Sequence, residues 1–172
     1  SQALLTEIAS IKPDVVYTFF AGAGAVKFVK DYAAAGLKDS IPLVGAGFLT
    51  DGTLDAQGES AQGLLTTLHY ADGLNPPRDN QFRLTYAKTY KMQPDVYAVQ
   101  GYDAAQMLGI GLAANKGDKK NRAALVKAIE KAKVDSPRGA FTLSSSHNPV
   151  QDIYLRKVDG KTNQVQSVAV KA

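Results

Sequence analysis

The sequence predicts an α/β fold in which strands alternate with helices and lie in a parallel sheet. Three consecutive segments carry this prediction. An uncharged apolar run at 15–20 follows Asp14, and its lack of alternation is typical of a strand buried on both faces of a parallel sheet. A helical pattern follows at 25–35. A second apolar run at 41–44 then closes a β-α-β unit, whose crossover should be right-handed.

The helix of this unit is predicted from its amphipathic spacing. Val26, Val29 and Ala33 fall three and seven positions apart and therefore share one face. Gly36 stands where helices commonly end in a left-handed residue, a conformation that glycine adopts without steric penalty. The helix should end just before this glycine and lead into the second strand.

The other elements follow from the same kinds of pattern. Leu4, Ile8 and Ile11 predict a first helix, which Pro13 ends by disfavouring the helical conformation before it. Near residue 70 the organisation changes, and a stretch with two prolines is the best candidate for a crossing between two parts of the chain. The remaining predictions are a third strand at 63–70, helices at 78–91, 97–114 and 121–133, a short strand at 141–143, and a C-terminal hairpin of 152–158 with 165–170.

Composition excludes several classes of function. The formal charge of +4 comes from 20 basic and 16 acidic residues, and the densest basic run, 116–122, lacks interleaved aromatic residues. Nucleic acid is therefore not an expected partner. The absence of cysteine excludes disulfides and thiolate chemistry. No apolar run approaches the roughly 20 residues of a membrane-spanning helix.

No set of residues predicts catalysis. His69 and His147 are the only histidines and have no metal-ligand spacing, and the serines at 144–146 lack the glycines of a nucleophile elbow. Gly22-Ala-Gly24 is similar to the start of a dinucleotide fingerprint, but Lys27 stands where the third glycine belongs. We therefore expect a binding protein without a cofactor or metal, and keep a nucleotide-dependent α/β enzyme as the alternative from another class.

The expected ligand site lies where the two strands of the β-α-β unit end. Ligands of open α/β sheets gather at the carboxyl ends of strands. Small residues occupy both ends, at 21–24 and at 45–47. Tyr97, near the start of a helix, is a further candidate that could project into a cleft while Tyr102 packs inside, although spacing alone favours packing in the core for both.

Six segments resemble the periplasmic solute-binding proteins of branched-chain amino acid ABC transporters, the Leu/Ile/Val-binding type. They occur in the family's order over nearly the whole chain, at 13–16 (PDVV), 33–37 (AAAGL), 42–45 (PLVG), 63–67 (GLLTT), 97–106 and 139–152. The reading NPVQDIY at 148–154 is most similar to a subgroup associated with aromatic and other non-amino-acid ligands.

This resemblance implies a type I periplasmic binding protein fold, in which two Rossmann-like lobes are joined by hinge crossings and close on a ligand. It implies that residues 1–70 belong to the second lobe, 71–147 are the returning helical part of the first lobe, and 148–172 form the C-terminal strands of the second lobe. The N-terminal half, with the serine and threonine residues that hold the ligand carboxylate, is expected as a cleaved part or a separate chain. The implied location is periplasmic, or extracytoplasmic with a lipid anchor, after a signal peptide in the precursor, and the implied partner is a membrane permease.

The resemblance also implies the ligand. Amino-acid binders of this family have a tyrosine at the position of Ala23, which stands beside Gly24. At the position of Gly47, before Phe48, they have the acidic residue that pairs with the ammonium of the ligand. A buried ammonium without a counter-charge is costly, so we expect a larger, less polar pocket for an aromatic or other apolar carboxylate. Tyr97 falls on the family's aromatic contact position.

Two alternatives stay open within this fold. A branched-chain or other hydrophobic amino acid would need another acidic partner, for which Asp51 and Asp103 are the candidates. A receptor sensor domain of the same fold would carry a signalling domain in the complete gene.

Overall fold

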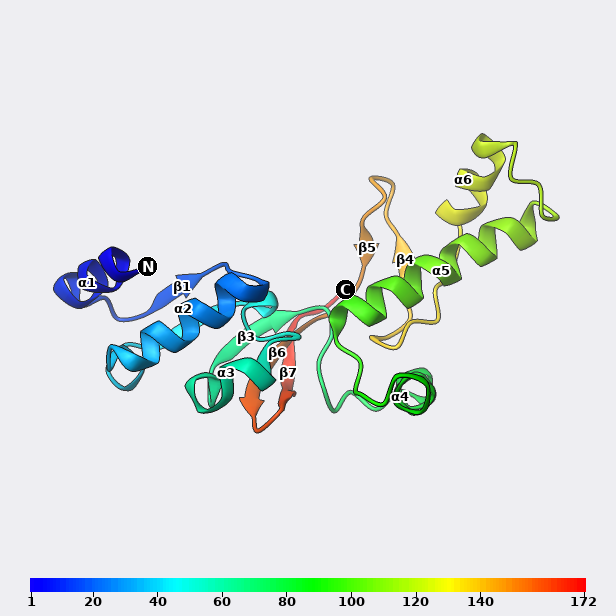
Figure 1. Cartoon of the computed structure of the whole chain (residues 1–172). Coiled ribbons are helices and arrows are strands. Elements are labelled where there is room, and N and C mark those ends of the chain that lie inside the picture. The colour runs from blue at the N-terminus through cyan, green and yellow to red at the C-terminus, as the bar shows by residue number, and fades with distance from the viewer. The chain divides into compact units, whose positions relative to one another are not determined.

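The computed structural model describes all 172 residues of the chain (Figure 1). The chain divides into two compact units. Unit 1 comprises residues 1–73 and 153–169, and unit 2 comprises 74–152 and 170–172. Each unit contains its own cluster of buried apolar side chains. No helix of either unit is both long enough and apolar enough to cross a membrane.

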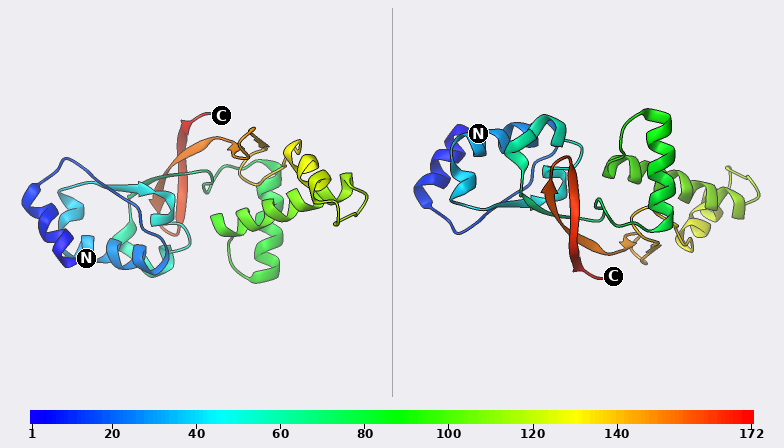
Figure 2. Two further views of the ribbon diagram at one scale, coloured as in Figure 1. Left: turned by 90° about the horizontal axis from the view of Figure 1, so that it is seen from above. Right: turned by 90° about the horizontal axis from the view of Figure 1, so that it is seen from below.

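Unit 1 is built on a five-stranded mixed sheet with the strand order β1-β2-β3-β6-β7. The first three strands are parallel, and β6 is antiparallel to β3. The predicted β-α-β unit is confirmed, since helix α2 connects β1 and β2, and the C-terminal hairpin of β6 and β7 is also present (Figures 1 and 2). The strands are β1 (Val16–Thr18), β2 (Leu43–Ala46), β3 (Leu65–Leu68), β6 (Ile153–Asp159) and β7 (Thr162–Val170).

The helices of unit 1 are α1 (Gln2–Ile11), α2 (Gly22–Ala34) and the short α3 (Leu54–Gln57). Gly36 adopts the predicted left-handed conformation with φ 76°. Helix α2 begins three residues earlier than predicted, so the small residues from Gly22 form its first turn. Its buried face is also rotated from the predicted one and consists of Ala25, Phe28, Val29 and Tyr32.

The prediction that the first strand is buried on both faces is wrong. Strand β1 is only three residues long and is the last strand in the sheet order, pairing with β2 alone. Tyr17 and Phe19 are 70% and 63% exposed, and Val15 is also exposed, whereas the alternate residues 16, 18 and 20 are half-buried. The run is uncharged, but it alternates in burial as a half-buried edge strand does.

Unit 2 is mainly helical, with α4 (Pro77–Tyr90), α5 (Val96–Ala114) and α6 (Arg122–Glu130) as predicted within a few residues. Helix α5 begins after Asp95, whose carboxylate accepts a hydrogen bond from the Ala98 amide at 3.1 Å. The strands β4 (Thr142–Leu143) and β5 (Pro149–Val150) form a short antiparallel pair. Strand β5 is not among the elements predicted from the sequence.

The aromatic residues of α4 stack along the helix as their spacing predicts. The ring centroids of Phe82 and Tyr86 lie 5.7 Å apart, and those of Tyr86 and Tyr90 lie 4.7 Å apart. Tyr102 of α5 packs against this series, with its ring 4.9 Å from that of Phe82. The aromatic side chains therefore connect α4 to α5.

Candidate ligand-binding site

The carboxyl ends of β1 and β2 lie at the same edge of the unit 1 sheet. The two strands are parallel, with Val16 opposite Leu43 and Thr18 opposite Gly45. The first turn of α2 follows β1, a 3₁₀ turn at Gly47–Leu49 follows β2, and α2 contacts this turn. Four of the predicted site residues, Ala23, Gly24, Gly47 and Phe48, are thus brought to one edge of unit 1.

The first turn of α2 is an open helix N-terminus. Residues 21–24 are all exposed, and a Cβ atom added at Gly24 would meet only Phe20 Cδ1, at 3.7 Å. The first N–H groups of a helix have no partner within it, and they lie at the positive end of the helix dipole. Small residues around such N–H groups allow a ligand to approach, and the local field favours a negative charge.

Phe48 is half-buried and lies beside a residue that sequence reasoning did not select. Its ring centroid is 5.9 Å from that of Phe19, at an interplanar angle of 57°. Phe19 was assigned to the interior of a buried strand, but it directly follows the end of β1 and its side chain is 63% exposed. Its place at the carboxyl end of a strand was the signal that could have identified it.

Gly47 does not open space at its own position, contrary to the expectation that this glycine enlarges the pocket. A Cβ atom added there would lie 2.5 Å from Leu68 Cβ and 2.8 Å from Arg156 Nη2. The volume that a side chain would occupy is therefore already filled. The glycine is required because the turn packs closely on β3 and on the Arg156 guanidinium.

Arg156 is fully buried and sits at the centre of a hydrogen-bonded network in unit 1. Its Nη2 donates a hydrogen bond to the Gly47 carbonyl at 2.9 Å, and its Nε donates one to Thr66 Oγ1 at 3.2 Å. Its Nη1 donates to Asp51 Oδ2 at 2.5 Å and to the Tyr70 carbonyl at 3.1 Å. Sequence reasoning missed this residue because its partners are distant along the chain.

Asp103, the other acidic candidate, lies in unit 2 and is also engaged by an arginine. Its Oδ2 accepts hydrogen bonds from Ser136 Oγ at 2.8 Å and from Arg138 Nε at 2.9 Å. Burial raises the pKa of Asp103, and the hydrogen bonds from Ser136 and Arg138 act in the opposite direction. The Arg138 guanidinium also lies 4.2 Å from the centroid of the Phe141 ring.

Tyr97 belongs to unit 2, where it occupies the first turn of α5. Its side chain is 47% exposed, while Val96 and Val99 beside it are fully buried. This exposure excludes the core packing that its spacing alone favoured. Contact between Tyr97 and a ligand stays a prediction.

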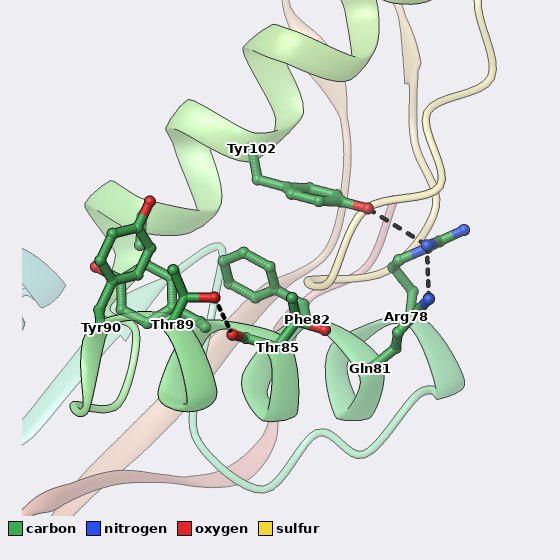
Figure 3. Close-up of a pocket in the computed structure, with 9 residues that line it drawn as sticks. Arg78, Gln81, Phe82, Thr85, Thr89, Tyr90 and Tyr102 are labelled. Carbon is green, nitrogen blue, oxygen red and sulfur yellow. Dashed lines mark hydrogen bonds between the residues drawn. The ribbon is translucent and has the colours of Figure 1, made fainter.

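Unit 2 also contains a groove with a volume of about 410 Å³ along α4 and α5. Aromatic side chains line it, and Arg78 stands at one end, donating to Gln81 Oε1 at 2.7 Å and to the Tyr102 hydroxyl at 3.3 Å (Figure 3). None of the predicted site residues lines this groove, which is distinct from the edge of the unit 1 sheet.

Together, these features define a class of protein. An α/β unit presents small and aromatic residues where neighbouring parallel strands end, and no group of three potential metal ligands occurs anywhere in the structure. The buried ionisable residues beside this edge form ion pairs. In open α/β sheets, an edge of this kind is where small-molecule ligands commonly bind.

The chain belongs to the periplasmic binding protein family, whose model matches residues 2–163. It is 34% identical over 149 residues to Leu/Ile/Val-binding protein homolog 6 of Brucella melitensis. That match covers 83% of this chain and 38% of the relative. The predicted resemblance is therefore confirmed.

Solved structures agree on the fold. A solute-binding protein of an ABC transporter from R. palustris, in complex with benzoate, superposes with a TM-score of 0.92 at 48% identity, over 99% of this chain and 48% of that one. A second one, from Rhodopseudomonas palustris BisB5 in complex with 3,4-dihydroxybenzoic acid, gives a TM-score of 0.86 at 30% identity, over 98% and 49%. A leucine-binding protein of Thermotoga maritima shares the fold, with a TM-score of 0.83 at 19% identity. The chain has the type I periplasmic binding protein fold and spans about half the length of these solved relatives.

Proposed function

We propose that the complete gene product is the solute-binding component of an ABC importer, and that it binds an aromatic or other apolar carboxylate between two lobes. The observation that carries this proposal is the pairing of both candidate acids. Asp51 and Asp103 each accept hydrogen bonds from a buried arginine, at 2.5 Å and 2.9 Å. Each carboxylate already has a cationic partner, so a ligand ammonium, whose burial without a counter-charge would be costly, would have to share it.

The chemistry of the unit 1 edge supports the same class of ligand. The first turn of α2 favours a negative charge over a positive one close to its N-terminus. Phe19 and Phe48 present two aromatic rings, one exposed and one half-buried, that suit tilted packing against a third ring. The R. palustris relative bound to benzoate, at 48% identity over nearly the whole chain, has a ligand with this chemistry.

A branched-chain amino acid is the second candidate ligand. It is favoured by the similarity to the Brucella Leu/Ile/Val-binding protein homolog. It requires an acidic partner for the ammonium from outside the described network, because the two acids named above are already paired.

The same proposal assigns the parts of the chain to lobes. We place residues 1–70 and 148–172 in the second lobe and 71–147 in the first, with Ala23, Gly24, Gly47, Phe48 and Tyr97 as ligand contacts. The family implies an extracytoplasmic location. The proposed partners are a membrane permease and the preceding half that the relatives carry.

A thermal-shift panel on the complete gene product tests the proposal. Benzoate, 4-hydroxybenzoate, leucine, phenylalanine and NAD would each be added, with benzyl alcohol as the control that keeps the ring and lacks the carboxylate. A ligand at about 100 times its dissociation constant stabilises the folded state by about 2.7 kcal/mol. We expect a rise in the unfolding midpoint with the benzoates alone. A rise with leucine alone would support the amino-acid alternative, and a rise with NAD alone would refute transport.

A further inference from the structure

We propose that Arg156 is a positioning residue for the ligand site, because it fixes the turn that carries Phe48. The role of Phe48 as a ligand contact rests on the function proposed above. Arg156 lies on β6 and reaches beneath the carboxyl ends of β2 and β3. Nothing in the local sequence around it indicates this role.

One guanidinium holds both ends of the segment 47–51. Its Nη2 donates to the Gly47 carbonyl, and its Nη1 donates to the Asp51 carboxylate. Phe48 lies between these two anchors. Within the segment, the Gly47 carbonyl also accepts hydrogen bonds from the amides of Thr50 and Asp51, at 3.1 and 2.9 Å. The path of the chain at Phe48 is therefore determined on both sides by Arg156.

The geometry of the guanidinium is specific to this task. Its donors point to Thr66, Tyr70, Asp51 and Gly47 at once, which the single ammonium of a lysine cannot reproduce. The side chain is fully buried, so water cannot replace a lost partner. A Cβ atom added at residue 47 would lie 2.8 Å from Nη2, which also explains why glycine stands there.

The position of this turn determines the aromatic surface at the edge of the sheet. Phe48 meets Phe19 at 5.9 Å between centroids, and Phe19 follows a different strand. A shift of the turn would move one ring of the pair and leave the other. Arg156 thus acts on the ligand through Phe48, and the pairing of its charge with Asp51 leaves no carboxylate there for an ammonium.

A double-mutant cycle on the complete gene product tests this role. By isothermal titration with benzoate, Arg156→Lys should lower the affinity about tenfold, the equivalent of roughly one lost buried hydrogen bond. In the background of Phe48→Leu, the same change should lower the affinity much less, because the group through which it acts is gone. Tyr32→Phe is the control, since it removes a buried hydrogen bond to the Ile41 carbonyl elsewhere in unit 1, and it should leave the affinity unchanged. Equal effects of Arg156→Lys in both backgrounds would overturn the proposal.

Hydrogen exchange provides a readout that does not depend on binding. Arg156→Lys should speed amide exchange in residues 47–51 about tenfold, whereas Tyr32→Phe should not. If Arg156→Lys fails to fold, Thr66→Val removes only the acceptor of Nε and should speed exchange in the same residues by a smaller factor. Unchanged exchange in a folded variant would refute the positioning role. If the parent protein binds no benzoate, the proposed function fails, while the exchange result still decides whether Arg156 holds the turn.

Discussion

Replacing Gly47 with alanine is the most direct test of the close packing at the unit 1 edge. The added Cβ would lie 2.5 Å from Leu68 Cβ and 2.8 Å from both Leu68 Cδ2 and Arg156 Nη2, whereas ordinary contact begins at 3.4 Å. Leu68 Cβ is attached directly to the backbone of β3, and Arg156 is held by four hydrogen bonds. Neither neighbour can move without disturbing the sheet.

The expected loss of stability follows from two opposing contributions. Overpacking in a well-packed interior costs about 1–3 kcal/mol. Alanine also restricts the unfolded chain, which offsets about 0.4–1 kcal/mol of that cost. With the middle of each range, the net loss is about 1.3 kcal/mol, so we expect Gly47→Ala to lower the free energy of unfolding by about 1–2 kcal/mol.

The assay is urea unfolding of the complete gene product, followed by far-ultraviolet circular dichroism. Gly24→Ala is the matched control, because its Cβ would meet only Phe20 Cδ1 at 3.7 Å and its position is helical. Alanine there should be neutral or stabilising by up to about 0.5–1 kcal/mol. The reasoning is refuted if Gly47→Ala is as stable as the parent, or if both substitutions have the same cost.

Three further predictions concern unit 2. Tyr97→Ala should weaken benzoate binding by about 1 kcal/mol or more in a titration, since it removes an exposed aromatic side chain, and an unchanged affinity would exclude it from the site. Arg138→Met should lower the free energy of unfolding by about 3–5 kcal/mol, because it leaves Asp103 buried without its charge partner. The prediction is contradicted if this variant loses less stability than a control at an exposed position, such as Lys120→Met. Because burial raises the pKa of Asp103 above 3.8, its contribution to stability is complete below pH 3.8 and lost as the pH rises through the raised value. The stability of the parent relative to Asp103→Asn should therefore be greater at pH 4 than at pH 7, and the opposite trend would refute the assignment.

Much of the fold could be predicted from local patterns. Helix α4 follows from aromatic residues spaced four positions apart, and the left-handed Gly36 follows from its place after a helix. These features depend on neighbours within a few positions, so the sequence contains what is needed to infer them. The order of the segments was also sufficient to indicate the family.

The site was predicted only in part, because its residues depend on contacts far along the chain. The small residues after β1 and β2 were identified from the rule for strand ends. The exposure of Phe19 was not, since an uncharged run looks the same whether one face or both faces of a strand are covered. The interpretation of Gly47 as a source of space also failed, because sequence does not show which way a missing side chain would point.

The sequence by itself determined the α/β class, the positions of the main helices and the edge at which a ligand is expected. Only the tertiary structure decided that both candidate acidic residues are paired with arginines. Arg156 and Asp51 are 105 positions apart, and Arg138 and Asp103 are 35 apart. The first pair forms when unit 1 folds, and the second pair forms when unit 2 folds. Both pairs depend on partners that are far apart in the sequence, and local pattern contains no record of them.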